Sequence, residues 1–138
     1  MKIFTTKGRL NRLKYFKYSM LLLLLTVIFA GIAIVSFQSD SFAFLIVALV
    51  CMLLCAVNYV GAIFLSIRRL HDLNLSGWWY ALICLVSIVS GFLQEIENET
   101  MQLAALGLNF VVMAFSMYLF VKKGTDGDND YGEDLLKS

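Results

Sequence analysis

The residues best suited to chemistry lie in one short segment, residues 68–79, which contains the only histidine and both tryptophans of the 138-residue chain. It reads RRLHDLNLSGWW and joins two strongly apolar runs. The guanidiniums of Arg68 and Arg69 could bind a phosphate group, and His71 could gain or lose a proton near neutral pH. His71 and Asp72 could also act together as acid–base groups. We therefore take Arg68, Arg69, His71 and Asp72 as a candidate site for an anionic lipid headgroup or a protein partner.

The same segment also suits a purely topological role. Charge next to hydrocarbon is costly, and arginines between two membrane spans hold a loop in the cytoplasm. Asp72 would then neutralise one arginine, and Trp78, Trp79 and Tyr80 would anchor the next helix at the membrane interface. This interpretation accounts for the residue types. It does not explain why a histidine, an asparagine, a serine and a glycine share one short turn.

Composition indicates that a membrane positions these residues. The chain is 60% hydrophobic and 15% charged, with a mean hydropathy of +0.80, whereas soluble domains carry about 25% charged residues. A soluble domain this small could not cover its surface with so few polar residues. Four runs contain no Lys, Arg, Asp or Glu, and we expect each to form a membrane-spanning helix: residues 18–37, 42–67, 77–93 and 101–121. The third lies at the lower limit of the roughly 17 to 25 residues that a span needs.

Charge alternates between the segments that connect these runs. All eleven basic residues lie before the first run, between the second and third, or after the fourth. Loops 38–41 and 94–100 carry only acidic charge. The positive-inside rule then predicts four spans with both termini in the cytoplasm. The expected fold is all-α, a polytopic bundle of four transmembrane helices that forms a single membrane domain over residues 1–138, with a cytoplasmic tail at 122–138.

The basic N-terminal segment allows two interpretations. Leu10, Leu13 and Phe16 recur at helical spacing among basic residues, which suits a short amphipathic helix on the membrane surface. A basic flank that orients the first span explains the same charges. We add Arg9 and Arg12 from this segment to the candidate lipid or partner site. The first apolar run is too long for a signal peptide and is not followed by an A-x-A cleavage site, so we expect an uncleaved helix.

Other residue groups give weaker signals. Cys51 and Cys55 lie one helical turn apart without a second cysteine pair, so buried thiols are expected rather than a copper site. Asp126 begins a stretch similar to a calcium loop, but Tyr131 and Lys137 stand where an EF-hand needs glycine and glutamate. We expect no metal site, no cofactor, no catalytic residue and no nucleic-acid partner.

Three segments together resemble a known family. They are residues 8–12 (GRLNR), residues 68–79 and residues 123–132 (KGTDGDNDYG). In this order they resemble the bacterial inner-membrane family called domain of unknown function 805, over essentially the whole chain. The resemblance implies a small multispanning protein of the bacterial cytoplasmic membrane. It implies no activity, substrate or catalytic residue.

Three functions stay open at this point. The first is a non-enzymatic membrane component that binds anionic lipids, a membrane-protein partner or a second copy of itself through its cytoplasmic face. The second is a subunit of a small transporter or channel that forms by oligomerisation, in which the mid-span amides of Asn58 and Asn109 and the segment 68–72 would line a pathway. The third is a membrane-embedded enzyme that modifies lipid through His71 and Asp72. We favour the first, because transport pathways usually contain ionisable groups and these spans have none.

Overall fold

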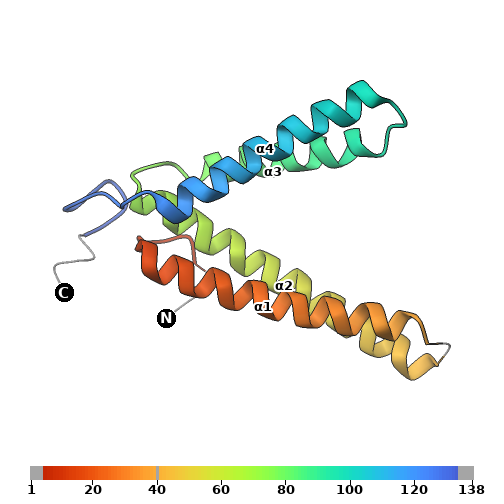
Figure 1. Ribbon diagram of the computed structural model, residues 1–138. Coiled ribbons are helices and arrows are strands. Elements are labelled where there is room, and N and C mark those ends of the chain that lie inside the picture. The colour runs from red at the N-terminus through yellow and green to blue at the C-terminus, as the bar shows by residue number, and fades with distance from the viewer. Residues whose placement is uncertain (1–4, 40, 134–138) are drawn as a thin grey trace. The chain divides into compact units, whose positions relative to one another are not determined.

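The computed structural model describes residues 5–39 and 41–133. This part of the chain consists of four α-helices joined by turns and contains no strand. Figure 1 shows the course of these helices. The helices are α1 (Arg12–Phe37), α2 (Phe42–Asp72), α3 (Trp78–Gln94) and α4 (Glu99–Val121). Each apolar run of the sequence coincides with one helix, so the all-α prediction is confirmed.

Three of these helices, α1, α2 and α4, are long and apolar enough to cross a membrane. Helix α3 has 17 residues, which makes it about 25 Å long, whereas the hydrocarbon core is about 30 Å thick. Large apolar side chains are exposed along all four helices, for example Phe42 at 75% and Phe92 at 71%. Such exposure is expected of helices whose apolar side chains face lipid rather than water.

The chain divides into two compact units, and each is described by itself. The first contains α1 from Leu13 onwards and α2 as far as Leu65, and the second contains residues 7–12 and the chain from Ser66 onwards. The single membrane domain expected from the sequence stays a prediction, because a division by internal contacts does not test whether the two units form one domain in a membrane.

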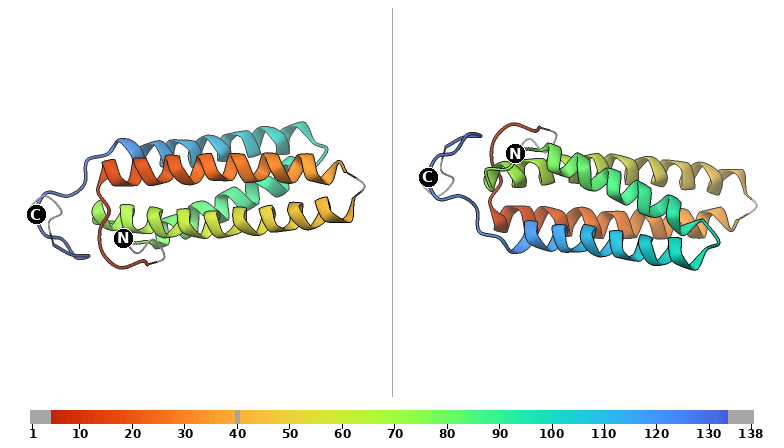
Figure 2. Two further views of the ribbon diagram at one scale, coloured as in Figure 1. Left: turned by 90° about the horizontal axis from the view of Figure 1, so that it is seen from below. Right: turned by 90° about the horizontal axis from the view of Figure 1, so that it is seen from above.

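In the first unit, α1 and the adjoining part of α2 run antiparallel, as the views of Figure 2 show. The Sγ atom of Cys55 lies 3.9 Å from the carbonyl oxygen of Thr26 on α1. Cys51 is buried, Cys55 is half-buried, and both thiols are free. The two thiols therefore belong to the packing of these helices.

The structure contradicts the interpretation of the N-terminal segment as a separate amphipathic surface helix. Helix α1 begins at Arg12 and continues without a break through the first apolar run, so Leu13 and Phe16 belong to the same helix as the span. Leu10 precedes the helix. The physical reason is that neither glycine nor proline, the two residues that most disfavour a helix, occurs between Arg12 and Ala30.

In the second unit, α2 ends in a Schellman motif. Asn74 adopts the left-handed conformation with φ of 56°. The N–H of Leu75 donates to the carbonyl of Leu70 at 2.9 Å, and the N–H of Asn74 donates to the carbonyl of His71 at 3.1 Å. These are the two bonds that define this helix end, and asparagine is the commonest substitute for glycine there. The asparagine in the polar segment therefore has a structural reason.

Gly77, the glycine of the same segment, also has a structural reason. A Cβ atom at Gly77 would lie 2.9 Å from Cγ2 of Ile67 on α2, so only glycine lets the chain pass so close to α2. The Ser76 carbonyl then accepts a hydrogen bond from the N–H of Trp79 at 3.2 Å, in the first turn of α3. The Ser76-Gly77 pair thus turns the chain directly into the next helix.

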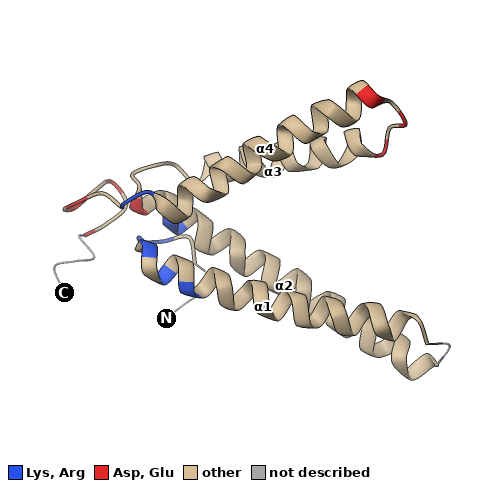
Figure 3. Ribbon diagram, in the orientation of Figure 1, with Lys and Arg blue, Asp and Glu red and all other residues tan. Residues whose placement is uncertain are grey.

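Helices α3 and α4 form an antiparallel pair in the second unit. Their contact includes a buried hydrogen bond of 3.0 Å from the Ser90 hydroxyl to the Ala105 carbonyl. The Asn98 side chain accepts hydrogen bonds from the N–H groups of Thr100 and Met101 and so caps the start of α4. Figure 3 shows acidic residues at the turn between α3 and α4, and lysine and arginine at the other end of α4.

Candidate functional site

The three segments that carry the family resemblance meet in the second unit. The N–H of Leu10 donates to the carbonyl of Arg68 at 3.1 Å. In return, Nη2 of Arg68 donates to the carbonyl of Arg9 at 3.4 Å. Residues 9 and 10 are thereby held against the last turn of α2. This pairing brings Arg9 next to Asp72, 63 positions along the chain.

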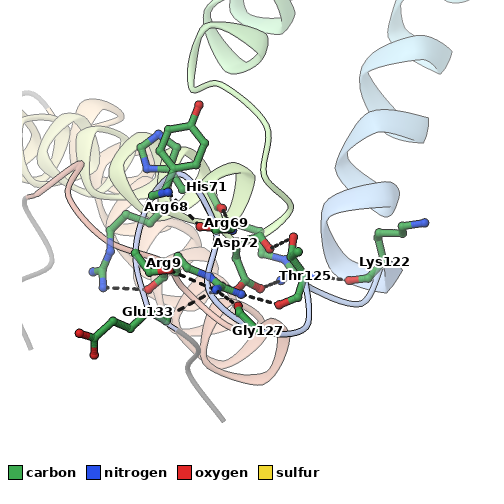
Figure 4. A network of polar contacts seen from close by, with 12 residues as sticks. Arg9, Arg68, Arg69, His71, Asp72, Lys122, Thr125, Gly127 and Glu133 are labelled. Carbon is green, nitrogen blue, oxygen red and sulfur yellow. Dashed lines mark hydrogen bonds and ion pairs between the residues drawn. The ribbon is translucent and has the colours of Figure 1, made fainter. Parts of the chain in front are cut away.

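Asp72 lies between two guanidiniums, as Figure 4 shows. Nε of Arg9 is 3.2 Å from Oδ1 of Asp72, and Nη1 of Arg69 donates to Oδ2. All three residues are buried, with exposed fractions of 5% for Arg9, 0% for Arg69 and 3% for Asp72. Burying charge is expensive unless it is paired and hydrogen-bonded. The cluster satisfies this condition. It keeps a net positive charge, because two guanidiniums face a single carboxylate.

Arg69 also binds the C-terminal end of α4. Its Nε donates to the carbonyl of Leu119 at 2.9 Å, and its Nη2 donates to the carbonyl of Lys122. Nη1 of Arg12 donates to the carbonyl of Val121 at 3.3 Å. The last carbonyls of a helix have no partner inside the helix and carry partial negative charge. The two arginines supply those partners, so α4 is capped by side chains from other segments.

The remaining donors of Arg9 bind the segment that follows α4. Its Nη2 donates to the carbonyl of Thr125 at 2.6 Å, and its Nη1 donates to the carbonyl of Gly127 at 2.6 Å. Nη1 also lies 3.3 Å from the carbonyl oxygen of Glu133 and 3.4 Å from that of Gly132. A single guanidinium therefore joins the end of α2 to the C-terminal segment.

This C-terminal segment, residues 122–133, lies against the end of α2 and is called the strap below. The N–H and hydroxyl of Thr125 both donate to the carbonyl of Asp72, at 2.8 and 3.1 Å. Nδ2 of Asn129 donates to the carbonyl of His71 at 2.8 Å. The rings of His71 and Tyr131 are stacked, 4.0 Å apart and within 5° of parallel.

Turn geometry gives the strap its shape. Gly127 and Gly132 have φ angles of 80° and 146°, which favour glycine. Asn129 and Gly132 exchange two backbone hydrogen bonds of 3.0 and 3.1 Å, and the N–H of Tyr131 donates to Oδ1 of Asn129. Asp126, Asp128 and Asp130 have exposed side chains. The acidic side chains of the strap therefore face solvent while its backbone docks on α2.

Six residues were proposed from the sequence for lipid or partner binding, and the structure brings all of them together in the second unit, where they contact protein groups. These residues are Arg9, Arg12, Arg68, Arg69, His71 and Asp72. Trp78 and Trp79, with exposed fractions of 81% and 49%, and the half-buried Tyr80 form the first turn of α3. Their roles as ligand contacts and interfacial anchors stay predictions.

Sequence reasoning missed the residues that receive the arginine hydrogen bonds. Most are backbone carbonyls, such as those of Leu119 and Thr125, and a carbonyl is the same in every residue type. Gly124 was missed as well, although a Cβ atom there would lie 2.1 Å from Oδ2 of Asp72. The one usable signal was the glycine-rich motif at 123–132, whose pattern by itself pointed to the family resemblance and to a calcium-loop likeness.

The fold and the site define a small all-α protein with membrane-type helices whose polar motifs form one buried network. The chain belongs to the family described as protein of unknown function DUF805, whose model matches residues 3–133. No curated protein and no solved structure matches the chain.

Proposed function

We propose that this protein spans the bacterial cytoplasmic membrane four times, with both termini in the cytoplasm. We also propose that it is a non-enzymatic membrane component that binds anionic lipid headgroups at its cytoplasmic face. The observation that carries the proposal is the network of Arg9, Asp72 and Arg69. It gathers the N-terminal segment, the end of α2 and the strap into one surface beside the ends of apolar helices.

Charge distribution supports this orientation. The acidic residues of the turn between α3 and α4 lie at one end of these two helices, and basic residues lie at the other end of α4. Lys and Arg in short loops set the orientation of membrane proteins, and they favour the cytoplasmic side. Both termini then lie in the cytoplasm only if α3 crosses the membrane with its 17 residues.

The orientation predicts the behaviour of reporter fusions. An alkaline phosphatase fused after Lys123 should be inactive, because it needs the periplasm, and a green fluorescent protein at the same place should fluoresce. The same two reporters fused after Glu97 should give the opposite result. Phosphatase activity after Lys123 combined with none after Glu97 would mean that α3 does not cross the membrane.

Exposed basic residues supply the lipid-binding charge. Lys7, Arg12, Lys122 and Lys123 are exposed and lie in the second unit next to the network. Basic residues beside a span attract anionic lipids by about 1 kcal/mol each. Arg9 and Arg69 are buried and bonded to protein oxygens, so in this structure they shape the surface. Asp72 is likewise held by two guanidiniums, an arrangement that does not favour the acid–base role of an enzyme.

Removing two of these charges should weaken the preference for anionic lipid. The double variant K122Q/K123Q should lose about fivefold per charge in relative affinity for phosphatidylglycerol over phosphatidylcholine, since about 1 kcal/mol corresponds to that factor. Quenching of the tryptophans by brominated lipids measures this ratio, because both exposed tryptophans begin α3. Glu97→Gln, at the opposite end of α3 and α4, is the matched control and should change little. Equal affinity of the wild type for the two lipids would refute the proposed function.

A further inference from the structure

The strap is docked mainly by polar contacts and by the ring of Tyr131. Every residue of 122–133 is exposed or half-buried. Its contacts with α2 include the hydrogen bond from Arg69 to the Lys122 carbonyl and the two hydrogen bonds of Thr125. They also include the hydrogen bond from the Asn129 side-chain amide to the His71 carbonyl and the stack of Tyr131 on His71. Segments with few buried apolar contacts open locally at a small free-energy cost. The strap therefore has the properties of a releasable element.

Beneath the strap lies a group suited to bind phosphate. The Nη1 and Nη2 atoms of Arg9 form the edge with which arginine grips phosphate or carboxylate in a bidentate manner. Four strap carbonyls surround this edge, and those of Thr125 and Gly127 are only 2.6 Å away. The strap oxygens thus occupy the positions that phosphate oxygens would take. Nε of Arg9 stays on Asp72 and fixes the direction of the guanidinium.

Release of the strap would replace the carbonyl acceptors of these Arg9 donors with water. An anion is a stronger acceptor for a guanidinium than water, because the hydrogen bonds are charge-assisted. The cluster favours one, because Arg9 and Arg69 together outweigh the single carboxylate of Asp72. The exposed side chain of Lys122 would add positive charge at the same place.

We propose that the strap and an anionic phosphate group compete for the Nη edge of Arg9, so that the strap closes this site when no such group is bound. The proposal rests on the anionic-lipid function above and deepens it by naming the group and the residue. The phosphate group belongs either to a lipid headgroup or to free phosphate, which share this chemistry.

Hydrogen exchange of the strap tests the competition. The full chain is placed in nanodiscs of phosphatidylcholine, with either phosphatidylglycerol or inorganic phosphate added. The N–H of Thr125, which donates to the carbonyl of Asp72, reports whether the strap is closed. Phosphatidylglycerol should accelerate its exchange several-fold over phosphatidylcholine alone. If inorganic phosphate accelerates the exchange to the same extent, the site takes free phosphate. If phosphatidylglycerol accelerates the exchange and inorganic phosphate does not, the site takes a lipid headgroup.

A pair of variants at Tyr131 separates the strap from the rest of the surface. Tyr131→Ala removes the stack on His71 and leaves Arg9 unchanged, so it should raise the affinity for phosphatidylglycerol several-fold. It should also increase the modification of Arg9 by phenylglyoxal. Tyr131→Phe keeps an aromatic ring for the stack and should behave like the wild type.

The outcomes distinguish this proposal from the proposed function. If the wild type prefers phosphatidylglycerol but the exchange of Thr125 is the same in all three conditions, the competition is refuted and the function stands. If Tyr131→Ala opens the strap without raising the affinity for phosphatidylglycerol, the competition is likewise refuted and the proposed function stands. If the wild type does not prefer phosphatidylglycerol and inorganic phosphate leaves the strap closed, both proposals are refuted.

Discussion

Replacing Asp72 by asparagine should lower the free energy of unfolding by about 3–5 kcal/mol, the usual cost of leaving buried charge without its partner. The substitution keeps the shape of the side chain, removes its charge and replaces one of the two oxygens that accept from Arg9 and Arg69 with an amide nitrogen that cannot accept. Arg9 and Arg69 would then remain buried next to each other with no carboxylate between them. Titration with sodium dodecyl sulfate in mixed micelles, followed by tryptophan fluorescence, measures this loss.

Asp126→Asn is the matched control for this experiment. Asp126 pairs with Lys123, but both side chains are about 70% exposed, and exposed ion pairs contribute little to stability. The control should therefore unfold at nearly the same detergent fraction as the wild type. A loss for Asp72→Asn no greater than that of the control would mean that the carbonyl bonds of the two arginines suffice, and that Asp72 is not central to the network.

The helices could be predicted from the sequence because their cause is local. A run of about 20 residues without charge has few alternatives to a helix in lipid, since every backbone group must be bonded within the segment. Two interpretations stayed open at the N-terminus, where Leu10, Leu13 and Phe16 were also consistent with a surface helix, and the structure contradicts that one of the two. Periodicity alone cannot distinguish an amphipathic helix from the first turns of a longer one. The helix is continuous from Arg12, and only the structure shows this.

The site could be predicted in its members but not in its arrangement. Charged residues in an apolar chain are conspicuous, so the arginines and Asp72 were found. Their partners were not found, because the capping of α4 by Arg69 depends on carbonyl groups 50 and 53 positions away. The turn residues of the same motif do have local explanations. Asn74 ends α2 in the left-handed conformation, and Gly77 passes close to Ile67.

The buried ion cluster has a consequence for how the motifs work together. Residues 9–10, the end of α2 and the strap are joined by hydrogen bonds and ion pairs. Breaking one partner of such a network leaves the others unsatisfied. The three motifs are thus expected to fail together when one is changed, even though they lie far apart in the sequence.

Gly124→Ala tests this coupling from the strap, with a loss of about 1–3 kcal/mol expected from overpacking. A Cβ atom at Gly124 would lie 2.1 Å from Oδ2 and 2.7 Å from Cγ of Asp72. The carboxylate has no room to turn away, because Arg9 and Arg69 hold its two oxygens. The strap must move instead, and the N–H of Thr125 should exchange faster than in the wild type. Gly107→Ala is the control, since a Cβ atom there meets nothing within 4 Å and alanine favours a helix over glycine by about 1 kcal/mol. Equal stability of the two variants in the same detergent titration would show that the strap is not seated against Asp72.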